Sequence, residues 1–176
     1  MKKSELAFMP EFFDRYINLA DDEDILTSLE NSLFELENID LEEWENLGDK
    51  VYAPNKWTIK DILQHLIDNE RIQVYRALRF ARNDRNQLQG YDQNLFGNNT
   101  AARKRTVLDL MEELILVRKG TLYLFKSFTN WMLRATGKAN GIELTVLAIG
   151  FTLVGHQKHH INIIRERYLP LLAESR

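Results

Sequence analysis

The chain has 176 residues, of which 44% are hydrophobic and 28% charged, a composition typical of globular rather than disordered proteins. Its net charge of -3 provides no general basic surface for nucleic acid, and the absence of cysteine excludes disulfides, thiolate metal sites and a cysteine nucleophile. Because the sequence shows neither a signal peptide nor a run long enough to cross a membrane, we predict one cytoplasmic domain over residues 1–176 that binds neither nucleic acid nor membrane.

The N-terminal part of the chain contains helical patterns separated by short loops. Apolar residues before residue 20 predict a short helix after Pro10 that packs on the body of the protein. Apolar side chains at helical spacing then predict a first long helix that ends near Asn38. Residues 41–50 indicate a brief helical turn and a loop, with Trp44 directed inward.

A capping box predicts the start of the second long helix. Thr58 is followed three positions later by Asp61, and an apolar stripe continues from there to about Arg82. Residues 83–104 form a long connection that contains two glycines and an Asn-Asn pair. A connection of about twenty residues is uncommon in a compact domain and is often functional.

Two more long helices are predicted in the second half of the chain. A helix rich in Leu and Val is expected to continue to residue 133, with Thr106 and Asp109 as a second capping box at its start. An Asn-Gly pair predicts a turn over residues 137–141. The last helix is expected over residues 145–169, with a threonine as N-cap and a proline after its end.

Four long helices joined in this way predict an all-α protein, a four-helix bundle with a short N-terminal helical extension. In such bundles metal sites are built from inward side chains of facing helices. The four histidines of the chain are therefore the first residues to consider.

Three of the four histidines lie in the last helix. His156 and His160 are one turn apart on one apolar face, the spacing by which a helix gives two imidazoles to one metal ion. His159 is rotated by about 100° from this pair, and His65 in the second long helix is the obvious third ligand. A single histidine on such a face is more often a hydrogen-bonded core residue, but a pair with a third on another helix favours a metal site.

The ligand set limits the metal and its use. Three neutral imidazoles suit Zn²⁺, Ni²⁺ or Fe²⁺, and the sequence does not choose among them. Three protein ligands leave positions open for water or substrate, which is the pattern of a catalytic site. We therefore expect one divalent ion per chain.

Other polar residues of the second long helix are candidates for supporting roles. Asp61 and Asn69 lie one turn to either side of His65 and are candidate hydrogen-bond acceptors for its second ring nitrogen. Arg76 and Arg79 share the His65 face about 16 to 21 Å along the helix, too far to touch the metal. We expect them to clamp a carboxylate at the far end of an extended cosubstrate.

Glu70 is a carboxylate inside the apolar stripe of the same helix. We expect a buried ion pair with an arginine, Arg165 or Arg167, rather than general-base catalysis. The catalytic residues stay unassigned, because a metal-bound water or thiol makes a separate base unnecessary.

The last helix is also apolar on the side opposite its histidines, through Leu144, Leu147, Phe151 and Val154. A helix that is apolar on both sides is buried on both sides. Either the N-terminal segment or a second subunit must therefore cover this face, and we predict a homodimer.

Four stretches of the sequence together form a family pattern: Lys56–Arg71, Tyr75–Arg82, Gly90-Tyr91-Asp92 and Gly155–His160. Through them the chain resembles the DinB-like (DinB/YfiT) superfamily of metal-binding four-helix bundles over about residues 22–169. The resemblance implies that His65, His156 and His160 are the metal ligands, that the helices follow an up-down-down-up order, and that the protein is a dimer. Relatives include metal-dependent transferases and isomerases that use low-molecular-weight thiols, and others described as hydrolases.

The sequence thus leads to two hypotheses. In the first, the protein is a metal-dependent transferase of the low-molecular-weight thiol type, or a hydrolase, acting on a small molecule through its three histidines. In the second, it is a non-catalytic metal-binding stress or structural dimer. A solvent-open, polar-lined site favours the enzyme, and a closed, dry site favours the alternative.

Overall fold

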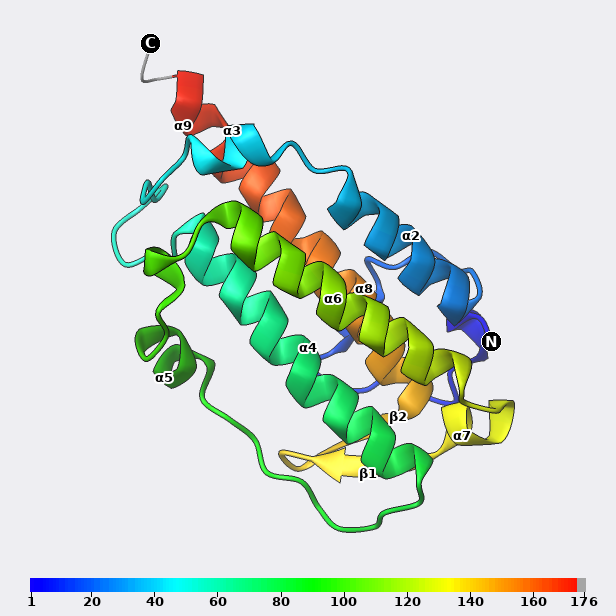
Figure 1. Cartoon of the computed structure of the whole chain (residues 1–176). Coiled ribbons are helices and arrows are strands. Elements are labelled where there is room, and N and C mark those ends of the chain that lie inside the picture. Colours follow the sequence, from blue (N-terminus) through cyan, green and yellow to red (C-terminus); the bar gives the residue numbers. More distant parts are fainter. Residues whose placement is uncertain (174–176) are drawn as a thin grey trace.

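A computed structural model describes residues 1–173 of the chain, so the last three residues of the expected domain lie outside the described part. The structure is mostly helical (Figure 1). Its longest helices are α2 (Ile25–Glu37), α4 (Ile59–Ala81), α6 (Val107–Lys126) and α8 (Val146–Ile163). Both α4 and α2 pack against α6 and α8, so the long helices surround a common interior. No helix in residues 1–173 is long and apolar enough to cross a membrane.

The predicted caps begin three of these helices. At α4 the capping box is complete, because Thr58 N donates to the Asp61 carboxylate at 2.9 Å and Asp61 N donates to Thr58 Oγ1 at 3.2 Å. Thr145 caps α8 as expected. At α6 only half of the box forms, since Thr106 accepts from Asp109 N while the Asp109 carboxylate pairs with Arg105.

Short elements connect the long helices. Trp44 lies in one of them, α3, and is buried as predicted. The long connection after α4 is not structureless, because it contains α5 and η2. The short elements are η1 (Lys3–Glu5), α1 (Asp14–Ile17), α3 (Leu41–Glu45), α5 (Gln93–Asn98), η2 (Ala102–Lys104), α7 (Asn130–Arg134) and α9 (Pro170–Ala173).

The segment between α6 and α8 differs from the prediction. The third long helix ends at Lys126, and Thr129 caps the separate helix α7. The expected turn is the tip of a β-hairpin, in which β1 (Thr136–Ala139) pairs antiparallel with β2 (Ile142–Thr145). Asn140 and Gly141 have φ angles of 52° and 78°, the left-handed pair that a two-residue hairpin turn requires. The protein is therefore mostly helical with a short sheet, not all-α.

The C-terminal end of the last helix also differs. The α-helix ends at Ile163 and continues as one wider π-helical turn over Ile164–Tyr168. The proline that was expected to follow the last helix, Pro170, is itself the first residue of the short helix α9.

The N-terminal segment covers the second apolar face of α8. Leu147 and Phe151 are fully buried, and α1 packs along α8. The N-terminal segment approaches α8 so closely at Gly155 that an added Cβ atom would lie 1.8 Å from the carbonyl oxygen of Tyr16. One of the two expected coverings is thus present within the chain, so this face does not itself require a second subunit.

Two apolar clusters fill the interior, and a belt of buried polar side chains separates them. One cluster contains Ile25, Phe80 and Phe151, and the other contains Leu36, Leu63 and Ile164. Along each long helix, the residues between the two clusters are polar and mostly buried: Ser32, Glu70, Gln73, Arg118, Thr121, His156 and Gln157. The candidate site lies on this belt.

The predicted buried ion pair of Glu70 exists, but its partner is Arg118 of α6. Arg118 Nε and Nη2 each donate to the carboxylate at 2.8 Å, and Thr121 Oγ1 donates at 2.6 Å. The prediction of Arg165 or Arg167 was wrong. Arg165 pairs with Glu35 of α2 instead.

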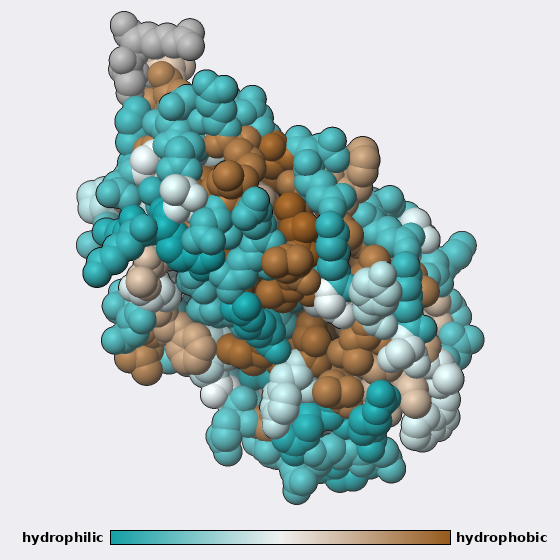
Figure 2. Space-filling view, viewed as in Figure 1, coloured by the Kyte–Doolittle hydropathy of each residue, from teal (hydrophilic) through white to brown (hydrophobic). Residues whose placement is uncertain are grey.

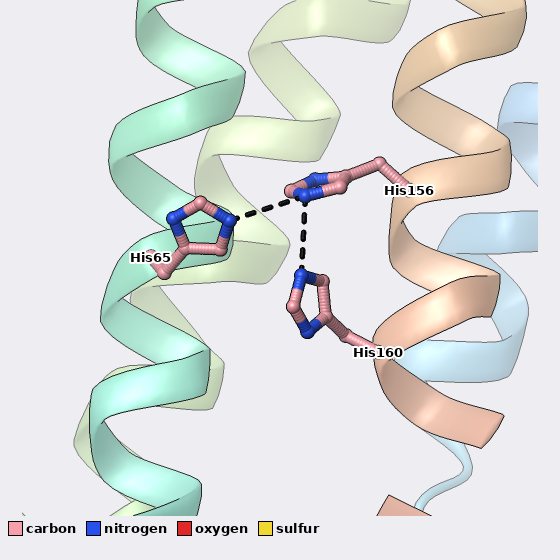
Figure 3. Close-up of side chains that lie close together, drawn as sticks. All are labelled: His65, His156 and His160. Carbon is pink, nitrogen blue, oxygen red and sulfur yellow. Dashed lines mark hydrogen bonds between the residues drawn. The ribbon is translucent and has the colours of Figure 1, made fainter. Parts of the chain in front are cut away.

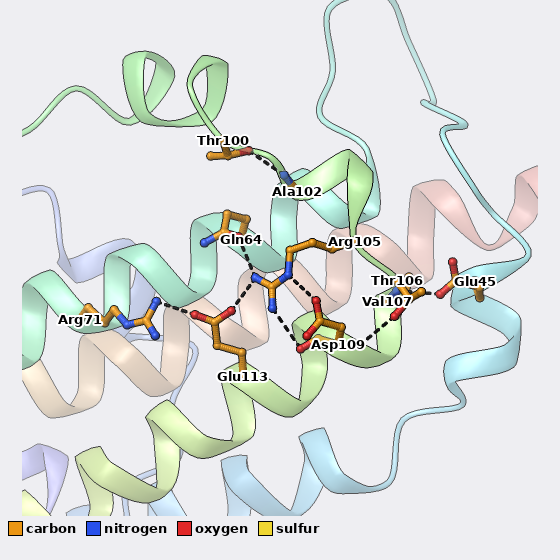
Figure 4. A network of polar contacts seen from close by, with 10 residues as sticks. All are labelled: Glu45, Gln64, Arg71, Thr100, Ala102, Arg105, Thr106, Val107, Asp109 and Glu113. Atoms are coloured by element: carbon orange, nitrogen blue, oxygen red, sulfur yellow. Dashed lines mark hydrogen bonds and ion pairs between the residues drawn. The ribbon is translucent and has the colours of Figure 1, made fainter.

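Surface contacts reinforce the α4–α6 pairing. Arg105 donates to Glu113 of α6 and to Gln64 of α4, and Arg71 of α4 pairs with the same Glu113 (Figure 4).

Hydrophobic residues gather on the exposed side of α6 and its border with α2 (Figure 2). Phe34, Leu116 and Tyr123 of these two helices are each more than 65% exposed.

Candidate metal centre

The three predicted histidines meet in the interior (Figure 3). His65 comes from α4, and His156 and His160 come from successive turns of α8. The Nε2 atom of His156 lies 3.1 Å from Nε2 of His65 and 3.1 Å from Nε2 of His160. One ring nitrogen from each residue lies within 4.8 Å of the other two, a group that could hold a metal ion.

Burial keeps these imidazoles neutral near pH 7. It lowers the pKa of His65 from 6.5 to about 4 and that of His160 to about 3. Burial, with the nearby His160 and His65, lowers the pKa of His156 well below 6.5. A neutral imidazole has one free nitrogen lone pair, which is the form that binds a metal.

The nitrogen separations fit a shared ion. Two nitrogens bound to one Zn²⁺ at about 2.1 Å and tetrahedral angles lie about 3.4 Å apart. Nε2 of His156 lies 3.1 Å from each of the other two nitrogens, and all three lie within 4.8 Å of one another. Hydrogen bonding alone explains the contacts less well. Nε2 of His156 carries either one proton or one lone pair, so it cannot make a normal hydrogen bond to both neighbours at once.

The residues expected to orient His65 have other partners. The Asp61 carboxylate accepts from Thr58 and from Arg103, and Asn69 Nδ2 donates to Tyr91 Oη at 2.8 Å. Among the described residues neither is hydrogen-bonded to His65. Nδ1 of His160 is buried and has no hydrogen-bond partner in the described part of the chain. The usual acceptor for the second nitrogen of a metal-bound histidine is thus missing there.

Aromatic side chains position the histidine rings. The Trp57 ring lies 4.8 Å from that of His65, and the Tyr16 ring lies edge-on to His156 at 4.9 Å. His159 does not belong to the three-nitrogen cluster, and its ring lies edge-on to those of Tyr16 and His160. Sequence reasoning missed Tyr16, because its contact depends on how the N-terminal segment folds over α8.

Two cavities border the histidine cluster. One, of about 230 Å³, lies between the N-terminal segment, α4 and the hairpin, and His156 lines it. The other, of about 250 Å³, is lined by His160 and by aromatic and polar residues such as Tyr52, Lys56 and Trp57. Each cavity therefore borders one histidine of the cluster.

The two candidate substrate arginines have different positions. Arg76 is 5% exposed and lines the cavity beside His156, where its Nη2 donates to the Gln89 carbonyl at 3.0 Å. Arg79 faces outward and pairs with Asp84 and with the hydroxyl of Tyr75. Arg79 does not line either of the two cavities beside the histidines.

The fold and the site define a mostly helical protein with a three-histidine cluster able to hold a metal ion. A family model described as DinB superfamily matches residues 25–164, and the chain belongs to this superfamily. A solved structure described as "YfiT from Bacillus subtilis is a probable metal-dependent hydrolase with an unusual four-helix bundle topology" is similar in fold. It shares 16% sequence identity and a TM-score of 0.66, with 91% of this chain and 87% of that chain covered. A search of curated proteins gives no match.

Proposed function

We propose that the protein binds one divalent ion, Zn²⁺, Ni²⁺ or Fe²⁺, through His65, His156 and His160 and is a metal-dependent enzyme. Its reaction is hydrolysis of a small molecule or transfer of a low-molecular-weight thiol to one. The observation that carries this proposal is the convergence of three neutral imidazoles, two buried and one partly buried, between two cavities. The description of YfiT as a probable metal-dependent hydrolase supports the same class of reaction.

A divalent ion held by three imidazoles lowers the pKa of a bound water or thiol and so supplies a nucleophile at neutral pH. The residues of the chain would bind and orient the second reactant. Burial raises the pKa of Tyr16 and of Tyr91, so both phenols stay protonated and can donate hydrogen bonds into the cavity beside His156. The aromatic walls would limit the access of bulk water.

The cavities favour an enzyme over a non-catalytic metal protein. A structural site is closed around its ion, whereas an enzyme leaves room for a reactant. Here His156 and His160 each line a different cavity, and the first cavity contains the polar groups of Asn69, Gln73 and Arg76. Two cavities also suit a reaction with two partners, such as thiol transfer.

We further propose the up-down-down-up bundle order, a single domain and a homodimer. The colours of Figure 1 support the order, because α4 and α6 advance in one direction along the bundle and α2 and α8 in the other. The exposed apolar residues of α2 and α6 offer a surface for a second subunit. Sedimentation equilibrium that shows only monomer at high concentration would contradict the dimer.

Turnover by the metal-loaded protein tests the proposed function. Two reactions are measured: hydrolysis of p-nitrophenyl acetate, and conjugation of glutathione or cysteine to 1-chloro-2,4-dinitrobenzene. Each rate is determined for wild type, for His156→Ala and for the neighbouring control His159→Ala. We expect metal-dependent turnover in wild type and His159→Ala and a loss of at least 100-fold in His156→Ala. Equal rates in all three proteins would contradict the proposal. Full metal content without metal-dependent turnover of any of these substrates would favour the non-catalytic alternative.

A further inference from the structure

We propose that the cavity beside His156 is a carboxylate subsite, in which Arg76 and Gln73 bind the anionic end of a small aromatic or apolar substrate. This inference rests on the proposed function for the reacting end of that substrate. The binding of the carboxylate itself depends only on residues of α4 and the cavity walls, so it can be tested separately.

Arg76 is a buried cation without an anionic partner. It is 5% exposed, and its one hydrogen bond in the described structure goes to the Gln89 carbonyl. No carboxylate of residues 1–173 forms an ion pair with Arg76. By contrast, Arg79, one turn later on α4, pairs with Asp84, and Arg118 of α6 pairs with Glu70. A buried charge that is not paired is unfavourable, because it has lost its hydration without gaining a counter-charge. An anion from outside the chain would remove this cost.

Gln73 provides a second unsatisfied group in the same cavity. It lies one turn before Arg76 on α4 and is 2% exposed, and its Oε1 has no hydrogen-bond partner within residues 1–173. A buried polar atom without a partner loses the hydrogen bonds that water would give it, which destabilises the empty cavity. The amide can present either its oxygen or its NH₂ group to a ligand. Two neighbouring side chains are thus incompletely satisfied and line one cavity.

The charge and size of the cavity indicate the class of ligand. Among its described lining residues Arg76 is the one charged group, which balances one negative charge and suits a carboxylate better than a phosphate dianion. The planar guanidinium also matches a carboxylate with two parallel hydrogen bonds. The volume of about 230 Å³ and the walls of Phe12, Phe13, Tyr16 and Tyr91 suit a small aromatic or branched body.

The subsite lies in the same cavity as one histidine of the cluster. Arg76 follows His65 by three turns of α4, about 16 Å along the axis. The Arg76 guanidinium donates to the Gln89 carbonyl beside this cavity, so it is held at the cavity wall. His156 lines the same cavity. A ligand bound at Arg76 therefore has its other end directed toward the cluster.

Binding of benzoate tests the subsite, with the neutral, nearly isosteric benzyl alcohol as ligand control. Affinities are measured by calorimetry for wild type, Arg76→Gln, Gln73→Glu and the matched control Arg79→Gln. We expect benzoate to bind wild type and Arg79→Gln equally well and at least 10-fold more tightly than benzyl alcohol. Binding should weaken at least 10-fold in Arg76→Gln. Gln73→Glu should lose benzoate binding while keeping or raising its Tm, because the new carboxylate pairs with Arg76.

Three results would overturn the subsite: no saturable benzoate binding to wild type, equal affinity for the two ligands, or unchanged benzoate affinity in Arg76→Gln. The titrations are repeated after metal removal by a chelator. Benzoate binding that disappears with the metal but survives in Arg76→Gln would place the carboxylate on the ion and also refute the proposal. Metal content is measured on each protein, so failure of the metal site is distinguishable from failure of the anion subsite.

Discussion

The buried ion pair between Glu70 and Arg118 should be a major determinant of stability. Both side chains are at most 3% exposed, and two charge-assisted hydrogen bonds of 2.8 Å join them. Removing one partner of such a pair leaves the other charge buried and typically costs about 3–5 kcal/mol. We therefore expect Glu70→Gln to lose about 3–5 kcal/mol of unfolding free energy, or roughly 10–15 °C in Tm for a protein of this size.

Urea unfolding followed by circular dichroism measures this loss, with Glu37→Gln as control. Glu37 pairs with Lys119 on the surface, and exposed pairs contribute about 0–1 kcal/mol. The double variant Glu70→Leu/Arg118→Met should regain most of the lost stability, because no unpaired charge remains. A loss below about 1 kcal/mol for Glu70→Gln, or a double variant as unstable as the single one, would show that the buried pair is not a major source of stability.

Packing, capping and burial lead to three more expected outcomes. Gly155→Ala should destabilise the protein by about 1–3 kcal/mol, because the added Cβ atom meets the Tyr16 carbonyl. Proteolysis of the segment before α2 should increase, and an unchanged Tm and digestion pattern would contradict this contact. Asp61→Ala should cost about 1–2 kcal/mol through loss of the capping box, and equal stability in urea would count against it. The metal-free protein should lose stability as the pH falls from 6.5 toward 4. In that range unfolded histidines bind protons, whereas His65 and His160, with folded pKa values of about 4 and 3, do not. The loss at pH 5 should be on the order of 1–2 kcal/mol per histidine, and urea unfolding that is independent of pH would exclude it.

Local patterns predicted the long helices well, because their starts depend on neighbours in sequence. Thr58 and Thr145 cap α4 and α8 through residues three positions away. The meeting of His65 with His156 and His160 was also predictable. Apolar periodicity directs His156 and His160 toward the interior, and His65 is the remaining histidine, on another long helix.

Features that depend on tertiary contacts were not predictable in this way. Sequence spacing could not distinguish Arg118 from the other arginines as the partner of Glu70, because that choice depends on which helices are neighbours. The hairpin strands are too short to produce a periodic signal, although their Asn140-Gly141 turn was evident. The cavity beside His156 depends on the N-terminal segment, whose path over α8 has no sequence signature.

Metal analysis of the purified protein tests the central proposal most directly. Wild type, His156→Ala and His159→Ala are loaded with Zn²⁺, Ni²⁺ or Fe²⁺ and separated from free metal. The bound metal per chain is then measured by inductively coupled plasma mass spectrometry. We predict about one ion per chain in wild type and in His159→Ala, and almost none in His156→Ala, since its Nε2 lies 3.1 Å from both other ligand nitrogens. Equal metal content in wild type and His156→Ala, or no bound metal in either, would contradict the three-histidine site.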